Sequence, residues 1–121
     1  MSISVLIVDD MATHLRHFQH LFLQLGVYTL TAASAEEALV VVQKSPVDAI
    51  FLDYNMPGMN GFDFVNAYKN LDVSKHAPII MMSTDMAINQ LAVQVGHAKA
   101  WVVKRATRDM VENALREVGV W

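Results

Sequence analysis

The stretch VLIVDD at residues 5–10 joins four apolar residues to an acidic pair, and short apolar runs of the same kind recur along the chain. Three more short apolar runs follow it: AIFL at 49–52, IIMM at 79–82 and WVV at 101–103. Short runs that are almost wholly apolar are typical of strands buried on both faces, as in a parallel sheet. A fifth run, VYTLT at 27–31, alternates more and is expected to be an edge strand.

Helical patterns separate these runs. Ser34 and Glu37 form a capping-box pattern at the start of one helix, while Gly26 and Pro46 end two of them. In the fourth helix the apolar stripe is Ile88, Leu91, Ala92 and Val95. The helices are expected at about 12–25, 34–44, 61–71, 85–95 and 107–118. Right-handed crossovers then predict an α/β fold with helices on both faces of one parallel sheet.

Composition narrows the class of protein. The chain has 121 residues, 54% of them hydrophobic, which fits one domain over residues 1–121. There is no cysteine, the formal net charge is -3, and no apolar run approaches the ~18 residues that span a bilayer. We see no signal peptide and no concentrated basic patch. We therefore expect a cytoplasmic protein that binds neither nucleic acid nor membrane directly.

Polar side chains stand where the predicted strands end. Asp9 and Asp10 follow the first strand, Asp53 the third, Ser83 and Thr84 the fourth, and Lys104 the fifth. Ligands of open α/β sheets bind beyond the carboxyl ends of the strands. We therefore expect three carboxylates, a hydroxyl and an ammonium to converge at one edge of the sheet.

Such a cluster restricts the chemistry. Three carboxylates at close range repel one another and need a counter-charge. Magnesium suits them, since it uses one or two carboxylates, several waters and a substrate phosphate. The Lys104 ammonium can hold a phosphoryl oxygen, and a hydroxyl can donate to another. The predicted site therefore suits an acyl phosphate or an incoming phosphoryl group.

Four stretches resemble the receiver domains of bacterial response regulators: LIVDD at 6–10, LDYNMPGMNG at 52–61, APIIMMST at 77–84 and AWVVK at 100–104. The resemblance covers essentially the whole chain. It implies a flavodoxin-like doubly wound (βα)5 fold with strand order 2-1-3-4-5. It also implies a role in two-component signalling, similar to that of chemotaxis-type single-domain regulators.

The resemblance further implies a role for each matching residue. Asp53 would be the phosphoacceptor, taking its phosphoryl group from a sensor histidine kinase or a phosphotransfer protein. Asp10 and Asp53 would bind Mg2+ directly, Asp9 mainly through water, and Asn55 through its backbone carbonyl. Lys104 would pair with the phosphoryl group. The chain would be no enzyme beyond its own phosphorylation and dephosphorylation.

Switching and timing are also implied. Ser83 would move toward the phosphoryl group and Trp101 would reorient behind it, changing the surface of the fourth helix, fifth strand and fifth helix for a downstream protein target. Asn55 and Asp85 occupy positions that tune dephosphorylation, and Thr84 narrows access to the site. These residues predict a phosphoryl lifetime of minutes or less.

Two departures from the family bear on Lys104 and Trp101. Arg105 replaces the usual proline after the lysine, so the Lys104–Arg105 peptide is either trans or a costly non-proline cis bond. Trp101 is larger than the usual Tyr or Phe. The residue can therefore be interpreted either as a side chain that reorients on phosphorylation or as a plain core residue.

Single residues also admit simpler interpretations. Asp9, Ser83 or Asp85 could merely cap a helix. The histidines of the first helix, His14, His17 and His20, are expected on a solvated face, and His97 receives no role.

The whole chain also admits four alternative functions. They are a flavodoxin-type cofactor carrier, a haloacid-dehalogenase-type phosphatase, a degenerate receiver that only binds partners, and a receiver excised from a longer regulator.

Overall fold

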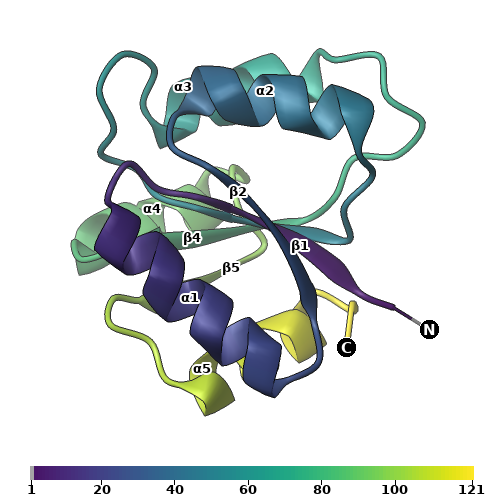
Figure 1. The fold of residues 1–121 in the computed structure, drawn as a ribbon. Helices are drawn as coiled ribbons and strands as arrows, with labels where there is room; N and C mark the ends of the chain where they lie inside the picture. Colours follow the sequence, from purple (N-terminus) through teal and green to yellow (C-terminus); the bar gives the residue numbers. More distant parts are fainter. Residues whose placement is uncertain (1) are drawn as a thin grey trace.

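The computed structural model describes residues 2–121, in which five strands alternate with five helices (Figure 1). In chain order these are β1 (Ser4–Val8), α1 (Ala12–Gln24), β2 (Tyr28–Ala32), α2 (Ala35–Lys44), β3 (Ala49–Leu52), α3 (Gly61–Lys69), β4 (Ile79–Ser83), α4 (Met86–Gln94), β5 (Ala100–Val103) and α5 (Arg108–Glu117). Each lies within two residues of its predicted position. Among the helices of this part of the chain, none is long and apolar enough to cross a bilayer.

All five strands are parallel and lie in the order β2-β1-β3-β4-β5, so the predicted doubly wound fold is confirmed. In the pair formed by β1 and β3, Val8 lies opposite Leu52. The backbone N–H of Asp53 donates to the Val8 carbonyl at 2.9 Å, which ties the ends of β1 and β3 together. The residues that follow these two strands are therefore neighbours.

Two apolar layers enclose the sheet, and alternate strand residues supply them. Leu6 and Val8 face a layer formed with α2, α3 and α4, whereas Val5 and Ile7 face a layer formed with α1 and α5. Figure 1 shows α2 and α3 above the sheet and α1 and α5 below it. Both faces are covered, which explains why β1, β3 and β4 read as continuous apolar runs.

The predicted apolar stripe of α4 is wrong in part. Leu91 and Val95 are 41% and 52% exposed, while Ala92 and the polar Asn89 are buried. The hydrogen bonds of the Asn89 side chain explain why α4 presents a different face to the sheet than expected. Its Oδ1 accepts from the Ser83 N–H and its Nδ2 donates to the Ser83 carbonyl, both at 3.0 Å. This clamp turns α4 so that part of its apolar face meets solvent.

Trp101 is not a core residue. Ala100 and Val102 face the layer formed with α1 and α5, so Trp101 between them lies on the opposite face of β5. Its side chain remains 36% exposed. The run WVV therefore belongs to an edge strand, and the face of β5 that carries Trp101 is only partly covered.

Candidate functional site

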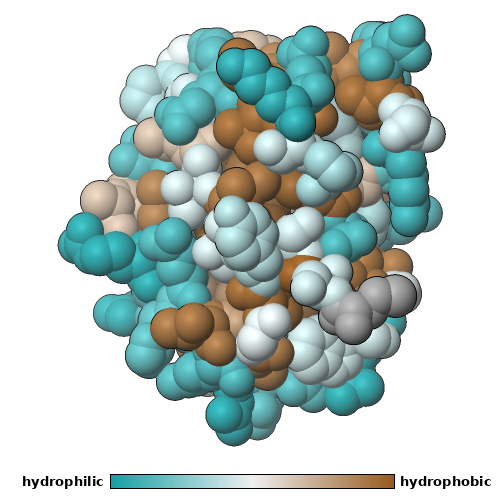
Figure 2. Space-filling model, turned by 45° about the vertical axis from the view of Figure 1, so that its right-hand side comes forward, coloured by the Kyte–Doolittle hydropathy of each residue, from teal (hydrophilic) through white to brown (hydrophobic). Residues whose placement is uncertain are grey.

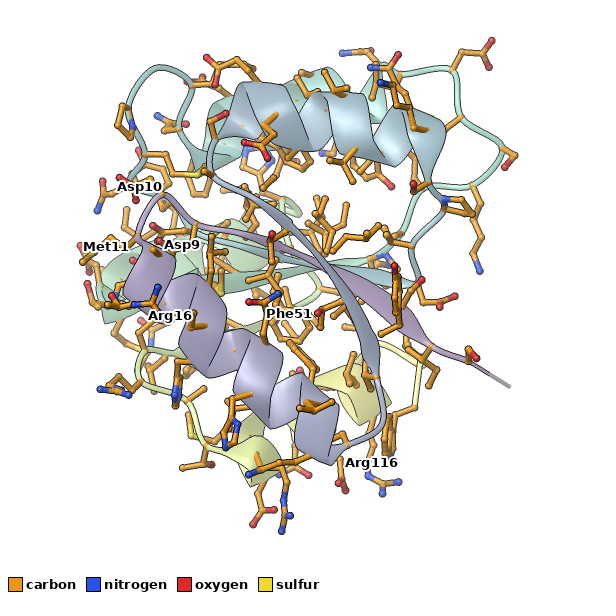
Figure 3. All side chains as sticks on the ribbon, viewed as in Figure 1. Asp9, Asp10, Met11, Arg16, Phe51 and Arg116 are labelled. Carbon is orange, nitrogen blue, oxygen red and sulfur yellow. The ribbon has the colours of Figure 1, made fainter. Side chains whose placement is uncertain are left out.

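Three aspartates meet at the carboxyl edge of the sheet. Asp9 and Asp10 follow β1, Asp53 follows β3, and one oxygen from each lies within 4.8 Å of the others. Figure 3 shows Asp9 and Asp10 where β1 turns into the first turn of α1. Asp9 and Asp53 are buried, while Asp10 is exposed and opens the cluster to solvent.

Lys104 supplies the counter-charge from the end of β5. Its Nζ lies 2.5 Å from Oδ2 of Asp9 and 3.2 Å from Oδ1 of Asp53, and its side chain is only 4% exposed. The ammonium therefore bridges carboxylates that follow two different strands. The Lys104–Arg105 peptide is cis, which answers the question left open by the missing proline.

The carboxylate of Asp9 has two roles in the geometry. Its Oδ1 accepts the Met11 N–H at 3.0 Å, beside a helix start that has no side-chain cap of its own. Its Oδ2 faces Lys104. The helix-capping interpretation is therefore incomplete, because the same side chain also belongs to the charged cluster.

Burial raises the pKa of Asp53 above its ordinary value of 3.8, and the neighbouring Asp9 raises it further. Lys104 and the Tyr54 N–H, which donates to Oδ1 at 2.9 Å, act in the opposite direction without cancelling the rise. Lys104 alone therefore does not neutralise the cluster, and an additional cation would lower its energy.

A pH-dependent stability follows for the protein in EDTA. Because the pKa of Asp53 is raised in the folded state, its stabilising contribution is present below pH 3.8 and is lost as pH rises through the folded pKa. Asp53→Asn should therefore increase the free energy of unfolding at neutral pH, with the gain shrinking toward pH 3.8. Urea unfolding of both proteins across this range measures it. A constant difference between them would contradict this account.

Gly61 lets the loop after β3 close on Asp53. A Cβ at Gly61 would lie 2.6 Å from the Asp53 carbonyl oxygen and 3.0 Å from the Tyr54 Cα. Its N–H also donates to the Tyr54 carbonyl at 2.9 Å. Any side chain at this position must displace the backbone that carries Asp53.

Gly61→Ala should therefore lower the free energy of unfolding by about 2–3 kcal/mol, since a clash with backbone resembles overpacking. It should also weaken magnesium binding. Gly96→Ala is the control, because its Cβ meets nothing within 4 Å and only its positive φ costs stability, about 1 kcal/mol. Urea unfolding and magnesium titration compare the two. Equal losses would show that contact with Asp53 is unimportant.

The remaining predicted residues lie at or just after the ends of β3 and β4, and they differ in exposure. Ser83 ends β4 and is buried, and its Oγ accepts the Asp85 N–H at 3.0 Å. Asp85 caps α4 by accepting from the Ala87 N–H at 3.0 Å. Asn55 and Thr84 are exposed in the loops after β3 and β4. Asp85 therefore does act as a helix cap, while Ser83 stands at the strand end itself.

His14 is the residue that the sequence reasoning missed. Its Nδ1 lies 3.0 Å from Oδ2 of Asp9 and 3.1 Å from Nζ of Lys104, and its side chain is 26% exposed. His17 also has an internal partner, the Ala106 carbonyl at 2.8 Å from Nε2. The expected solvated histidine face is wrong for these two residues and holds for the exposed His20. Helical spacing alone does not reveal that the first turn of α1 adjoins Asp9.

His14→Ala should weaken magnesium binding about tenfold, because partners that orient a metal-binding carboxylate typically matter to this extent. Binding is measured by calorimetric titration. His20→Ala, on the exposed side of the same helix, should leave the affinity unchanged. Unaltered magnesium affinity in His14→Ala would contradict a role in holding Asp9.

The donor set fits magnesium. All three side chains offer hard carboxylate oxygens, and the exposed Asp10 leaves one side of the cluster open. Magnesium favours such oxygen ligands and keeps several positions for water and phosphate oxygens. This arrangement is compatible with Mg2+ binding.

Residues 5–116 match the response regulator receiver domain, and the chain belongs to this family. It is 31% identical over 117 residues to chemotaxis protein CheY of Pseudomonas aeruginosa, covering 94% of each chain. Chemotaxis response regulator CheY4 of Vibrio cholerae has a TM-score of 0.85 and 34% identity, over 98% of this chain and 99% of that one. The chain is thus similar to single-domain chemotaxis regulators and is a receiver of two-component signalling.

The chain is also similar to a segment of a longer protein. The autoinducer 1 sensor kinase/phosphatase LuxN of Vibrio harveyi is 36% identical over 119 residues, which are 98% of this chain and 13% of that protein. Membership of the receiver family sets aside the flavodoxin-type and haloacid-dehalogenase-type interpretations.

Proposed function

We propose that residues 1–121 form one receiver unit that accepts a phosphoryl group on Asp53 with bound Mg2+. The donor would be a phosphohistidine of a sensor histidine kinase or phosphotransfer protein. The observation that carries the proposal is the meeting of Asp9, Asp10 and Asp53 with Lys104 at the carboxyl edge of the sheet.

Asp53 is suited to act as the nucleophile. One of its oxygens attacks phosphorus, the phosphorus–nitrogen bond of the donor breaks, and the imidazole leaves, so that an acyl phosphate forms on Asp53. The bond from the Tyr54 N–H to Oδ1 holds the carboxylate in place. The Lys104 ammonium, already 3.2 Å from Oδ1, pairs with the charge of the incoming group.

Asp9, Asp10, Asp53 and the Asn55 carbonyl would hold the metal, which neutralises the charge that gathers on the phosphoryl oxygens. The contribution of the protein's own residues is to place these charged groups around the phosphoryl group. Phosphoryl transfer depends chiefly on placement and charge neutralisation, so few other groups are needed.

The structural change caused by phosphorylation would be transmitted from the site to the protein surface through β4 and β5. Ser83 ends β4, and Asn89 of α4 clamps its backbone with two hydrogen bonds, so a shift of Ser83 pulls on α4. Leu91, Val95 and Trp101 already expose apolar surface on α4 and β5. The α4–β5–α5 surface is therefore the face we propose for a downstream protein target.

Tryptophan fluorescence tests this proposal. Trp121→Phe leaves Trp101 as the single tryptophan, and the protein is titrated with Mg2+ and then with beryllofluoride, which mimics a phosphoryl group on a carboxylate. We expect a magnesium-dependent change with beryllofluoride that is absent after Asp53→Asn. The same response in both proteins would overturn the role of Asp53. No uptake of either ligand by calorimetry would favour a degenerate receiver that only binds partners.

A further inference from the structure

A second cavity, separate from the Asp53 site, lies at the amino ends of the strands, at the opposite end of the sheet from Asp53. Its volume is about 790 Å³, and Val65, Tyr68, Ile79 and Val120 are among the apolar residues that line it. Figure 2 is turned toward the side where the chain ends lie, and apolar side chains run through the middle of that view with hydrophilic ones around them. The size falls in the range of small-molecule sites.

Positive charge is concentrated around this cavity. Lys69, Lys75 and Lys99, three of the five lysines, line it, although the chain as a whole has a net charge of -3. None of the three forms an ion pair with a carboxylate of residues 2–121. Asp48 is the one acidic residue of the lining, and its Oδ2 accepts the Ser4 N–H at 2.8 Å.

Favourable interaction with a helix dipole explains the position of only one of these three lysines. Lys69 lies in the last turn of α3, where a cation is favourable. Lys75 and Lys99 lie outside the helices, in the segments before β4 and β5. The carboxyl end of α4 is satisfied by its own turn, in which the His97 N–H donates to the Ala92 carbonyl at 2.8 Å. The ammonium groups of these three exposed lysines are therefore available to an anion.

His97 adds an independent observation. His97 is one of the residues that line the cavity, and its Nδ1 is buried without a hydrogen-bond partner among residues 2–121. Phe62 packs against the ring with 4.8 Å between centroids. Burial and then Lys69 lower the pKa of His97, so the ring is neutral at pH 7. Nδ1 of this neutral ring is therefore a buried polar atom beside the cavity that the described residues leave without a partner.

We propose that this cavity binds a small organic phosphate with a flat apolar body, the class that includes nucleoside diphosphates. Phosphate groups match unpaired lysines, and a ring system matches the apolar lining. The size of the cavity and the acidic net charge of the chain favour a small ligand over a nucleic acid or a membrane surface. The proposal does not depend on phosphorylation of Asp53.

The test uses ADP and GDP that carry a fluorescent methylanthraniloyl group on the ribose, added to the full chain in EDTA. Without magnesium, the acidic cluster at Asp53 repels phosphates, so binding reports on the second cavity. The variant combines Lys69→Gln, Lys75→Gln and Lys99→Gln. The control combines Arg16→Gln, Lys44→Gln and Arg108→Gln, which change the net charge equally at exposed positions outside the cavity. Circular dichroism verifies that both variants fold.

We expect saturable binding that the cavity variant weakens at least tenfold and the control variant less than threefold. Amide NMR shifts should concentrate at Ala77, Gly96 and Gly119, which line the cavity, and spare Gly61 beside Asp53. Failure of both nucleotides to bind at about 1 mM would overturn the proposal. Equal weakening in the two variants would also overturn it, since it would reveal charge attraction without a site.

Discussion

Asp53→Asn should take up no phosphoryl group from acetyl phosphate and Mg2+, whereas the wild-type chain should gain one. The amide is a poor nucleophile, and it removes one of the three carboxylates that would hold the metal. Because burial disfavours the charged form of Asp53, the variant should nevertheless fold well. Intact mass spectrometry at short reaction times measures the difference.

A matched control is Asp109→Asn, an exposed aspartate in the first turn of α5, which should be modified as fast as wild type. If Asp53→Asn gained a phosphoryl group at the wild-type rate, another residue would be the acceptor. Asp53 would then be only a metal ligand.

Lys104→Met should destabilise the protein by about 3 kcal/mol in EDTA and by much less in saturating Mg2+. Removing one partner of a buried ion pair leaves the other charges uncompensated, which is costly. Here the uncompensated groups are Asp9 and Asp53, both buried and both in contact with the ammonium. A bound magnesium ion would restore the counter-charge. Urea unfolding with and without the ion measures both values.

Lys44→Met is the control, since Lys44 is exposed and distant from the cluster. Its effect should be small and independent of magnesium. Equal destabilisation of Lys104→Met in the two conditions would mean that Lys104 stabilises through packing, and that no metal replaces its charge.

Much of the fold was predictable because parallel strands buried on both faces leave a strong apolar signal. The runs at 5–8, 49–52 and 79–82 became central strands. The meeting of Asp9, Asp10, Asp53 and Lys104 followed from topology, since parallel strands end at one edge.

The parts that sequence could not predict depend on contacts between elements. His14 lies on α1, and only the turn from β1 into that helix brings its Nδ1 to Asp9. The buried Asn89 turns α4 by binding the Ser83 backbone, which no apolar periodicity can reveal. Exposure of Trp101 depends on how far α4 covers the edge strand β5. The cluster of lysines around the second cavity likewise unites segments far apart in the chain.

The most direct test of the central claim is to map the modified residue. Wild-type protein is treated with acetyl phosphate and Mg2+, the acyl phosphate is trapped by borohydride reduction, and peptides are sequenced by tandem mass spectrometry. We predict a single reduced side chain at position 53, and none when EDTA replaces magnesium. Labelling of another residue, or of none, would contradict the assignment of this edge of the sheet as a phosphoryl-accepting site.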